Sequence, residues 1–307
     1  MGESNLNLSN KASLIAPRVI SLGQIIVDLT MKVDAVPASG EDIFASSYSM
    51  RAGASYNMLF AASQMEAKAQ WAGVLGEGYF ANIISKALNE AHISHIGTKN
   101  STLDSGFCIA LTDASAERTF ISTKGAETRG DEHAFDLVNP NPQDVVYLSG
   151  YTFVSPIKRA LLRFMMRTSG SSGLGSSALE SSFYNRTRRF TAIFDASPMI
   201  ANILDEDLKA LIAYAPIWLC NAREAGILAR RLNTWGDANE GAANGIFTYE
   251  TNNQLTKQKI ELLQRALQAP LVVHTGSDGA WVCDLSKEAE HIKGFQVKAV
   301  DTNGAGD

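Results

Sequence analysis

The strongest constraint on the fold is an alternation between short apolar runs and longer stretches in which apolar residues have helical spacing. Four of these runs are rich in Val, Ile, Leu and aromatic residues, and they occupy Asp144–Ser149, Ala192–Asp195, Ile217–Cys220 and Leu271–Thr275. Short strands that are apolar on both faces are typical of a parallel sheet covered by helices. The sequence therefore predicts an α/β fold with a central, mostly parallel sheet flanked by helices.

The same pattern extends into the N-terminal half and the remaining segments. Arg18–Asp28 is predicted to be a first buried strand that ends at a carboxylate, and Gln70–Val74 a further strand. The predicted helices are Ala54–Glu66, Tyr79–Ala91, a helix from Pro156, and Glu261–Gln268. The Ser/Gly-rich segment Thr168–Ser182 and the Gly/Asn/Ala-rich segment Gly236–Gly245 are predicted to be flexible loops inside this fold.

A small second sheet is predicted near the N-terminus. Thr30–Ser49 is rich in β-formers, with Pro37 and Gly40 as a turn, and Phe107–Thr112 and Arg118–Ser122 read as a strand pair. Such strands could form a lid over the carboxyl ends of the main strands, where ligands bind in open α/β sheets; an ordinary edge hairpin is the alternative. We expect one domain over 18–307, a lid formed by about 30–50 plus 106–122, and a disordered tail over 1–17.

Charge and composition exclude several classes of function. The net charge of -5 argues against a nucleic-acid partner, because phosphates call for a basic surface. No stretch approaches the roughly 20 apolar residues of a membrane span. The three cysteines are far apart and form no CxxC or Cys/His cluster, so we expect buried thiols, no zinc site and a cytoplasmic location.

The last seven residues, DTNGAGD, contain the clearest chemical signal. The small residues Gly304, Ala305 and Gly306 would let backbone N–H groups approach an anion, and a helix that starts there would add its positive end. Asp307 would stand beside that anion, where a carboxylate can accept the proton of an attacking hydroxyl. By itself the segment would be better read as a glycine-rich turn with an Asp at the helix start.

This segment resembles the DTxGAGD signature of the ribokinase-like carbohydrate kinases, the PfkB family, and matches all six specified positions. The resemblance implies a Rossmann-like α/β fold and an ATP- and Mg²⁺-dependent transfer of phosphate to a hydroxyl of a sugar-like molecule. Asp307 would be the general base, and the backbone of Gly304, Ala305 and Gly306 the anion hole. The family continues beyond this motif with the helix that completes the nucleotide site, so we expect a chain ending at Asp307 to be incomplete and inactive as a kinase.

A second family signature, two glycines followed by Asn at a helix start, is similar to Arg51–Asn57. Gly53 matches the second glycine and Asn57 the sugar-contacting amide, whereas Ala52 replaces the first glycine. Asp28 matches the acidic residue that binds sugar hydroxyls in this family. Without the resemblance, Asn57 would be read as a helix-start residue and Asp28 as a turn residue.

Two further motifs point to the nucleotide. Asn221 and Glu224 resemble the family's NxxE motif, which implies contact with phosphate and with Mg²⁺, through water; at a helix start the two side chains share one face. The segment from Thr275 resembles the family's nucleotide loop, and the residues it implies are Thr275, Gly276, Ser277 and Gly279. His274 stands where the family often has Thr, and we expect it to be packed or solvated.

Two other functions stay open at this point. A nucleoside kinase of the same superfamily would need an aromatic pocket for the base, which Tyr48, Tyr56 and Phe107 could supply. A non-catalytic sugar-binding relative is the second alternative, although the intact Asp307 speaks against it. Some family members dimerise through the lid, and the apolar content of Ile43–Met50 allows a homodimer here.

Overall fold

The computed structural model describes residues 16–115, 118–169, 188–234 and 255–297. The predicted N-terminal tail up to residue 15, most of the Ser/Gly-rich segment, the loop at Gly236–Gly245 and the DTNGAGD motif lie outside the described residues. None of the helices in the described part of the chain combines the length and apolarity needed to cross a bilayer.

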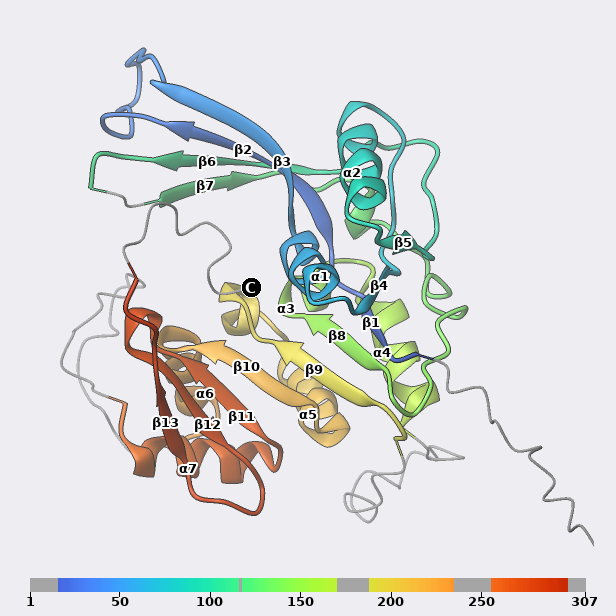
Figure 1. Ribbon diagram of the computed structural model, residues 1–307, viewed down its shortest axis with the longest axis vertical. Helices are drawn as coiled ribbons and strands as arrows, with labels where there is room; N and C mark the ends of the chain where they lie inside the picture. The colour runs from blue at the N-terminus through green and yellow to red at the C-terminus, as the bar shows by residue number, and fades with distance from the viewer. Residues whose placement is uncertain (1–15, 116–117, 170–187, 235–254, 298–307) are drawn as a thin grey trace, which may run out of the picture.

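A nine-stranded sheet forms the body of the molecule, as Figure 1 shows. Its order is β13-β12-β11-β10-β9-β8-β1-β4-β5; the strands from β5 to β11 are parallel, and β12 and β13 continue the sheet antiparallel. The strands are β1 (Arg18–Ser21), β4 (Lys68–Trp71), β5 (Ser94–His95), β8 (Val145–Ser149), β9 (Thr191–Asp195), β10 (Ile217–Asn221), β11 (Leu271–His274), β12 (Gly279–Cys283) and β13 (Glu290–Lys293). The predicted parallel α/β sheet is confirmed.

Seven α-helices cover this sheet in the described part of the chain. They are α1 (Ser55–Gln64), α2 (Tyr79–Glu90), α3 (Gly150–Phe153), α4 (Lys158–Thr168), α5 (Asp205–Tyr214), α6 (Ala222–Arg231) and α7 (Lys257–Leu267). The larger of two hydrophobic cores lies around β8 to β11 and includes the fully buried Phe194 and Trp218, whose rings meet edge to face at 5.0 Å. The smaller core joins α1 and α2 to β4 and β2, with Leu59, Ile84 and Trp71 at its centre.

A separate four-stranded sheet, the lid, lies over the side where β8, β9 and β10 end (Figure 1). Its order is β3-β2-β6-β7, from β3 (Ser47–Ala54), β2 (Ile25–Lys32), β6 (Phe107–Thr112) and β7 (Arg118–Ser122). Strand β2 pairs antiparallel with β3 and parallel with β6. The small second sheet is therefore present, but its first two strands extend further toward the body than Thr30–Ser49, and most of the 33–46 segment connects them.

The prediction of one strand over Arg18–Asp28 was wrong, because the chain changes sheets within it. β1 ends at Ser21 in the large sheet, and β2 starts at Ile25 in the lid. Between them Gly23 is fixed on three sides: its N–H donates to Ser21 Oγ at 3.0 Å, its carbonyl accepts from Trp71 Nε1 at 2.9 Å, and a Cβ there would overlap Ser55 Oγ. The apolar run is continuous across this turn, so hydropathy does not reveal the change.

The base of the lid is tied to the body by a buried carboxylate. Glu127 is 2% exposed and accepts the backbone N–H groups of Gly106 and Gly125, both at 2.8 Å. These two residues lie immediately before β6 and shortly after β7, so one side chain holds both ends of the lid hairpin. The carboxylate also satisfies two N–H groups that would otherwise be buried without acceptors.

The region after β8 also differs from the prediction. A helix was expected from Pro156, but α3 starts directly at Gly150, and the longer α4 begins only at Lys158. Ser149 caps α3 by accepting the N–H of Tyr151 at 3.3 Å. The short helix α3, which contains Tyr151, follows the carboxyl end of β8 and lies beneath the lid (Figure 1).

Candidate active site

Polar side chains gather at the carboxyl ends of the central parallel strands. Asp195 ends β9 and Asn221 ends β10, while Tyr151 follows β8 by two residues. These strands are neighbours in the sheet, so their ends meet at one edge. This is the edge at which open α/β sheets bind ligands.

The lid contributes the pair formed by Asp28 and Gly53. Asp28 lies in the middle of β2, in register with Arg51 of β3 and Cys108 of β6, rather than at the end of a strand as predicted. A Cβ atom on Gly53 would overlap Asp28 Oδ2. Only glycine therefore lets this carboxylate lie against β3, and two residues of the predicted acceptor set, Asp28 and Gly53, come together in the structure.

Asn57 is the third residue of α1 and is half-buried, so the predicted position at a helix start is confirmed. The residue before the helix, Ala54, has φ 55° and ψ -129°, a conformation that glycine adopts far more readily than alanine. This sharp turn carries the chain from lid strand β3 into α1. Asn57 thus stands where the lid joins the body, four residues from Gly53.

The three aromatic residues considered for a nucleobase pocket have separate surroundings. Tyr56 donates to the carbonyl of Ala87 on α2 at 3.4 Å. Phe107 stacks on Phe80, also on α2, with ring centroids 4.7 Å apart. Tyr48 is 74% exposed in β3. None of these contacts places the rings together beside Asp28.

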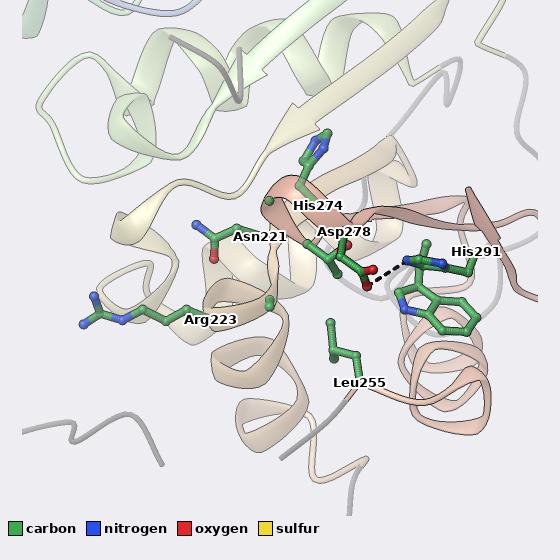
Figure 2. Close-up of a pocket in the computed structure, with 10 residues that line it drawn as sticks. Asn221, Arg223, Leu255, His274, Asp278 and His291 are labelled. Atoms are coloured by element: carbon green, nitrogen blue, oxygen red, sulfur yellow. Dashed lines mark ion pairs between the residues drawn. The ribbon is translucent and has the colours of Figure 1, made fainter. Parts of the chain in front are cut away.

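A cavity of about 610 Å³ lies at the ends of β10 and β11 (Figure 2). Its lining consists of Asn221, Ala222, Arg223, Leu255, His274, Thr275, Gly276, Asp278, Trp281 and His291. Figure 2 shows Arg223 and Asn221 on one side, and Asp278 paired with His291 at 3.3 Å on the other. Of the predicted nucleotide residues, the structure brings Asn221, Thr275 and Gly276 to this cavity, and Ser277 and Gly279 are not among its lining residues.

Thr275 carries an unused polar atom at this cavity. Its Oγ1 is buried and has no hydrogen-bond partner among the described residues. Gly276, next to it, has φ 66° with open space around the Cβ position, and Gly279 has φ 113° against the backbone of Ile292. The loop therefore uses its two glycines to turn from β11 into β12, and it leaves the buried Thr275 hydroxyl without a partner among the described residues.

Asn221 and Glu224 hold each other in a reciprocal cap at the start of α6. The Glu224 N–H donates to Asn221 Oδ1, while the Glu224 carboxylate accepts both the N–H and the Nδ2 of Asn221, all at 2.9 Å. Glu224 is 5% exposed. Burial raises the pKa of Glu224, nearby Asp195 raises it further, and the bonds from Asn221 oppose this. The motif therefore forms a helix cap. Burial and the nearby Asp195 both disfavour the charged form of its carboxylate, Glu224.

Asp195 is a candidate residue to which the sequence analysis assigned no role. Its Oδ2 accepts the hydroxyl of buried Tyr147 at 2.6 Å, and its Oδ1 accepts the N–H of Ser197 at 3.1 Å. Asp195 also raises the pKa of Glu224, as expected for two carboxylates near the ends of neighbouring strands. The available signal was an Asp that ends a predicted strand, Ala192–Asp195, which is a weak signal without the neighbouring strands.

Comparisons with known proteins agree on one family. The model described as "pfkB family carbohydrate kinase" matches residues 16–307. The "Uncharacterized sugar kinase YegV" of Escherichia coli (strain K12) is 28% identical over 292 residues, which are 94% of this chain and 78% of that protein.

Solved structures share the fold at low sequence identity. Ribokinase from Giardia lamblia aligns with a TM-score of 0.70 and 17% identity, over 95% of this chain and 80% of that one. Ribokinase from Thermotoga maritima gives 0.67 and 19%, over 94% and 82%. The adenosine kinase from Sinorhizobium meliloti gives 0.69 and 15%, over 94% and 84%. This shared architecture is a ribokinase-like α/β fold with a lid.

Proposed function

Because the chain belongs to the pfkB family of carbohydrate kinases, we propose that it transfers a phosphoryl group from ATP to a hydroxyl of a sugar or sugar-like small molecule. The observation that carries this proposal is the two-sided arrangement at the sheet edge. A lid carboxylate, Asp28, lies on one side, and a cavity at the start of α6 lies on the other. A kinase needs an acceptor site and a nucleotide site that meet in this way.

In this proposal the acceptor binds to Asp28, Gly53 and Asn57. A carboxylate can accept hydrogen bonds from two neighbouring hydroxyls, and the amide of Asn57 can both donate and accept. Gly53 supports the site by leaving room for Asp28. This set suits a polyol better than a planar base.

The nucleotide is assigned to the cavity at Asn221, Thr275 and Gly276, with Ser277 and Gly279 shaping the loop. The N-terminal end of α6 and the unpartnered Thr275 hydroxyl both favour a phosphate-bearing ligand. The described residues present no group of three His, Cys, Asp or Glu side chains able to hold a metal directly. Glu224 and Asp195 are hard oxygen donors, so they fit a hydrated Mg²⁺, which keeps several waters.

Bound Mg²⁺ would neutralise charge on the nucleotide phosphates. Asp307 is proposed as the base that takes the proton of the attacking hydroxyl, and the N–H groups of Gly304, Ala305 and Gly306 as the anion hole for the transferred phosphate. These roles rest on the family motif, since the four residues lie outside the described part of the chain. A cytoplasmic location is included in the proposal, since Cys108, Cys220 and Cys283 are unpaired.

A nucleoside acceptor is the second candidate. One observation favours it: the TM-score to the Sinorhizobium meliloti adenosine kinase, 0.69, lies between those to the two ribokinases, 0.67 and 0.70. Against it, Tyr56 and Phe107 are both engaged with α2 rather than lining a base pocket. A homodimer through the lid is also proposed, supported by exposed apolar residues there, Phe44, Tyr48, Phe120 and Ile121.

The test is a coupled ADP-release screen of the full-length protein with ATP and Mg²⁺ against neutral sugars, sugar acids and nucleosides. We expect turnover with a neutral sugar or polyol and little with nucleosides. Preference for a nucleoside would replace the first candidate by the second. Binding without any ADP release across the panel would instead indicate a non-catalytic sugar-binding relative.

A further inference from the structure

Tyr151 is held at the sheet edge by a chain of hydrogen bonds from both parts of the molecule. Its N–H donates to Ser149 Oγ at 3.3 Å, and its carbonyl accepts from Ser155 Oγ at 2.6 Å. Ser155 Oγ in turn accepts from Gln24 Nε2 at 2.8 Å. Gln24 lies in the turn where the chain leaves the large sheet for the lid, so Tyr151 is positioned by the body and by the lid junction together.

The start of α3 is also pressed against the end of β9. Ser149 is in register with Asp195, and the next residue, Gly150, has no space for a side chain. A Cβ on Gly150 would overlap the carbonyl oxygen of Ala196 and lie 2.5 Å from Ser197 Oγ. This close approach fixes Tyr151 beside the Asp195 end of the edge.

The hydroxyl group of Tyr151 has no structural role in the described part of the fold. The side chain of Tyr151 is 42% exposed, and its hydroxyl makes no hydrogen bond within the described residues. This contrasts with Tyr147, two strand positions earlier on β8 than Ser149, whose hydroxyl is bound to Asp195. A tyrosine whose main chain is held in place and whose hydroxyl is an idle donor is suited to contact a ligand.

The electrostatic surroundings of Tyr151 agree with a position at the sheet edge beneath the lid. Partial burial raises the pKa of Tyr151, and Asp195, Cys108, Glu224 and Asp28 raise it further. Asp195 and Glu224 belong to the large sheet and α6, while Asp28 and Cys108 belong to lid strands β2 and β6.

We propose that Tyr151 contacts the acceptor molecule, its hydroxyl donating a hydrogen bond to an acceptor oxygen between Asp28 and Asp195, and that the site therefore selects neutral polyols over sugar acids. The inference rests on the proposed kinase function and adds a specificity-determining residue to it. A neutral hydroxylated acceptor can use the carboxylates as hydrogen-bond acceptors and the phenol as donor. An anionic acceptor would meet the like charge of Asp28.

The test compares Tyr151→Phe with wild type in steady-state kinetics of the full-length protein, with the best neutral sugar from the acceptor screen. Loss of one neutral hydrogen bond should raise KM for the acceptor about threefold to tenfold and leave KM for ATP within about twofold. Tyr79→Phe is the matched control, because Tyr79 is 62% exposed at the start of α2. That variant should match wild type in both constants.

The predicted preference for neutral acceptors is tested by comparing kcat/KM for each neutral aldose with kcat/KM for the corresponding aldonic acid. We expect kcat/KM at least about tenfold higher for the neutral member, a difference of about 1.4 kcal/mol. Equal acceptor kinetics in Tyr151→Phe and wild type, an equal rise in KM for ATP, or a preference for the acid would each overturn the inference while leaving the kinase function in place. A wild type that phosphorylates no acceptor would remove the proposed function itself, and this inference with it.

Discussion

The carboxylate of Asp28 occupies the space that a side chain on Gly53 would fill. The two residues lie on paired lid strands, Gly53 opposite Ile26 and Asp28 two positions further along β2. This contact links the absence of a side chain in one strand to the placement of an acidic group in the other. It explains why position 53 of the N-terminal signature is a glycine.

Gly53→Ala should therefore damage acceptor binding more than folding. The new methyl group would displace the Asp28 carboxylate, and we expect KM for the acceptor to rise at least about tenfold, with KM for ATP little changed. Ser49→Ala is the control, because it removes a lid hydrogen bond to Thr30 without approaching Asp28. Steady-state kinetics measure both KM values in the two variants. An unchanged acceptor KM in Gly53→Ala would show that Asp28 does not bind the acceptor.

Ala54→Gly should stabilise the protein. Ala54 has a backbone conformation of φ 55° and ψ -129°, and glycine in its place would remove strain of about 1 kcal/mol. Ala61→Gly is the matched control, since Ala61 is exposed within α1 and glycine there should cost about 1 kcal/mol. Urea unfolding should show opposite signs for the two variants. A loss of stability in Ala54→Gly would mean that the turn into α1 is not strained.

Asp144→Asn should destabilise the junction of β1 and β8 in a pH-dependent way. Burial alone would raise the pKa of Asp144, but hydrogen bonds from Arg18 and from the N–H groups of Arg18 and Asn141 lower it on balance. A lowered folded-state pKa means that the carboxylate stabilises the fold above its unfolded pKa and loses this contribution as the pH falls. We expect a cost of about 3 kcal/mol at pH 7, because a buried ion pair loses one partner.

That cost should shrink as the pH falls through the range in which Asp144 becomes protonated, and chemical denaturation at several pH values measures it. Lys86→Gln is a suitable control, because the Lys86–Glu90 pair is exposed and should contribute little. A cost for Asp144→Asn that is constant from neutral to acid pH would contradict the assigned ion pair with Arg18.

Asp195→Asn should weaken the binding of the Mg²⁺ that the reaction requires. If Asp195 and Glu224 together hold the water shell of the ion, removing one charge should raise the Mg²⁺ concentration for half-maximal rate about tenfold or more. Tyr147→Phe is the control, since it removes the 2.6 Å hydrogen bond to Asp195 but keeps the charge. Its Mg²⁺ requirement should stay within about threefold of wild type. Equal Mg²⁺ titrations for Asp195→Asn and wild type would exclude Asp195 from the metal site.

Much of the fold was predictable because strand and helix periods are local properties. The four apolar runs from Asp144 to Thr275 became β8, β9, β10 and β11 with small boundary shifts. The change of sheet at Gly23 was not predictable, because it depends on Ser55 and Trp71, which are distant in sequence. The antiparallel extension by β12 and β13 was also missed: Ala280 to Cys283 are apolar, but the segment was read only as the end of a glycine-containing loop.

The candidate site shows a similar division. The pairing of Asp28 with Gly53 and the cap formed by Asn221 and Glu224 follow motifs that are readable in the sequence. A functional role for Asp195 or Tyr151 can be inferred only from the strand register and from neighbouring residues in other elements. The roles of Gly304, Ala305, Gly306 and Asp307 remain predictions from the family signature.

The central claim is that Asp307 activates a sugar hydroxyl for attack on ATP, and Asp307→Asn in the full-length protein tests it most directly. Phosphate-ester formation followed by phosphorus NMR with the best neutral acceptor should fall by about a thousandfold or more, because the general base is lost. Calorimetric binding of the same acceptor should stay within about threefold of wild type. Phosphorylation at the wild-type rate by Asp307→Asn would contradict the account.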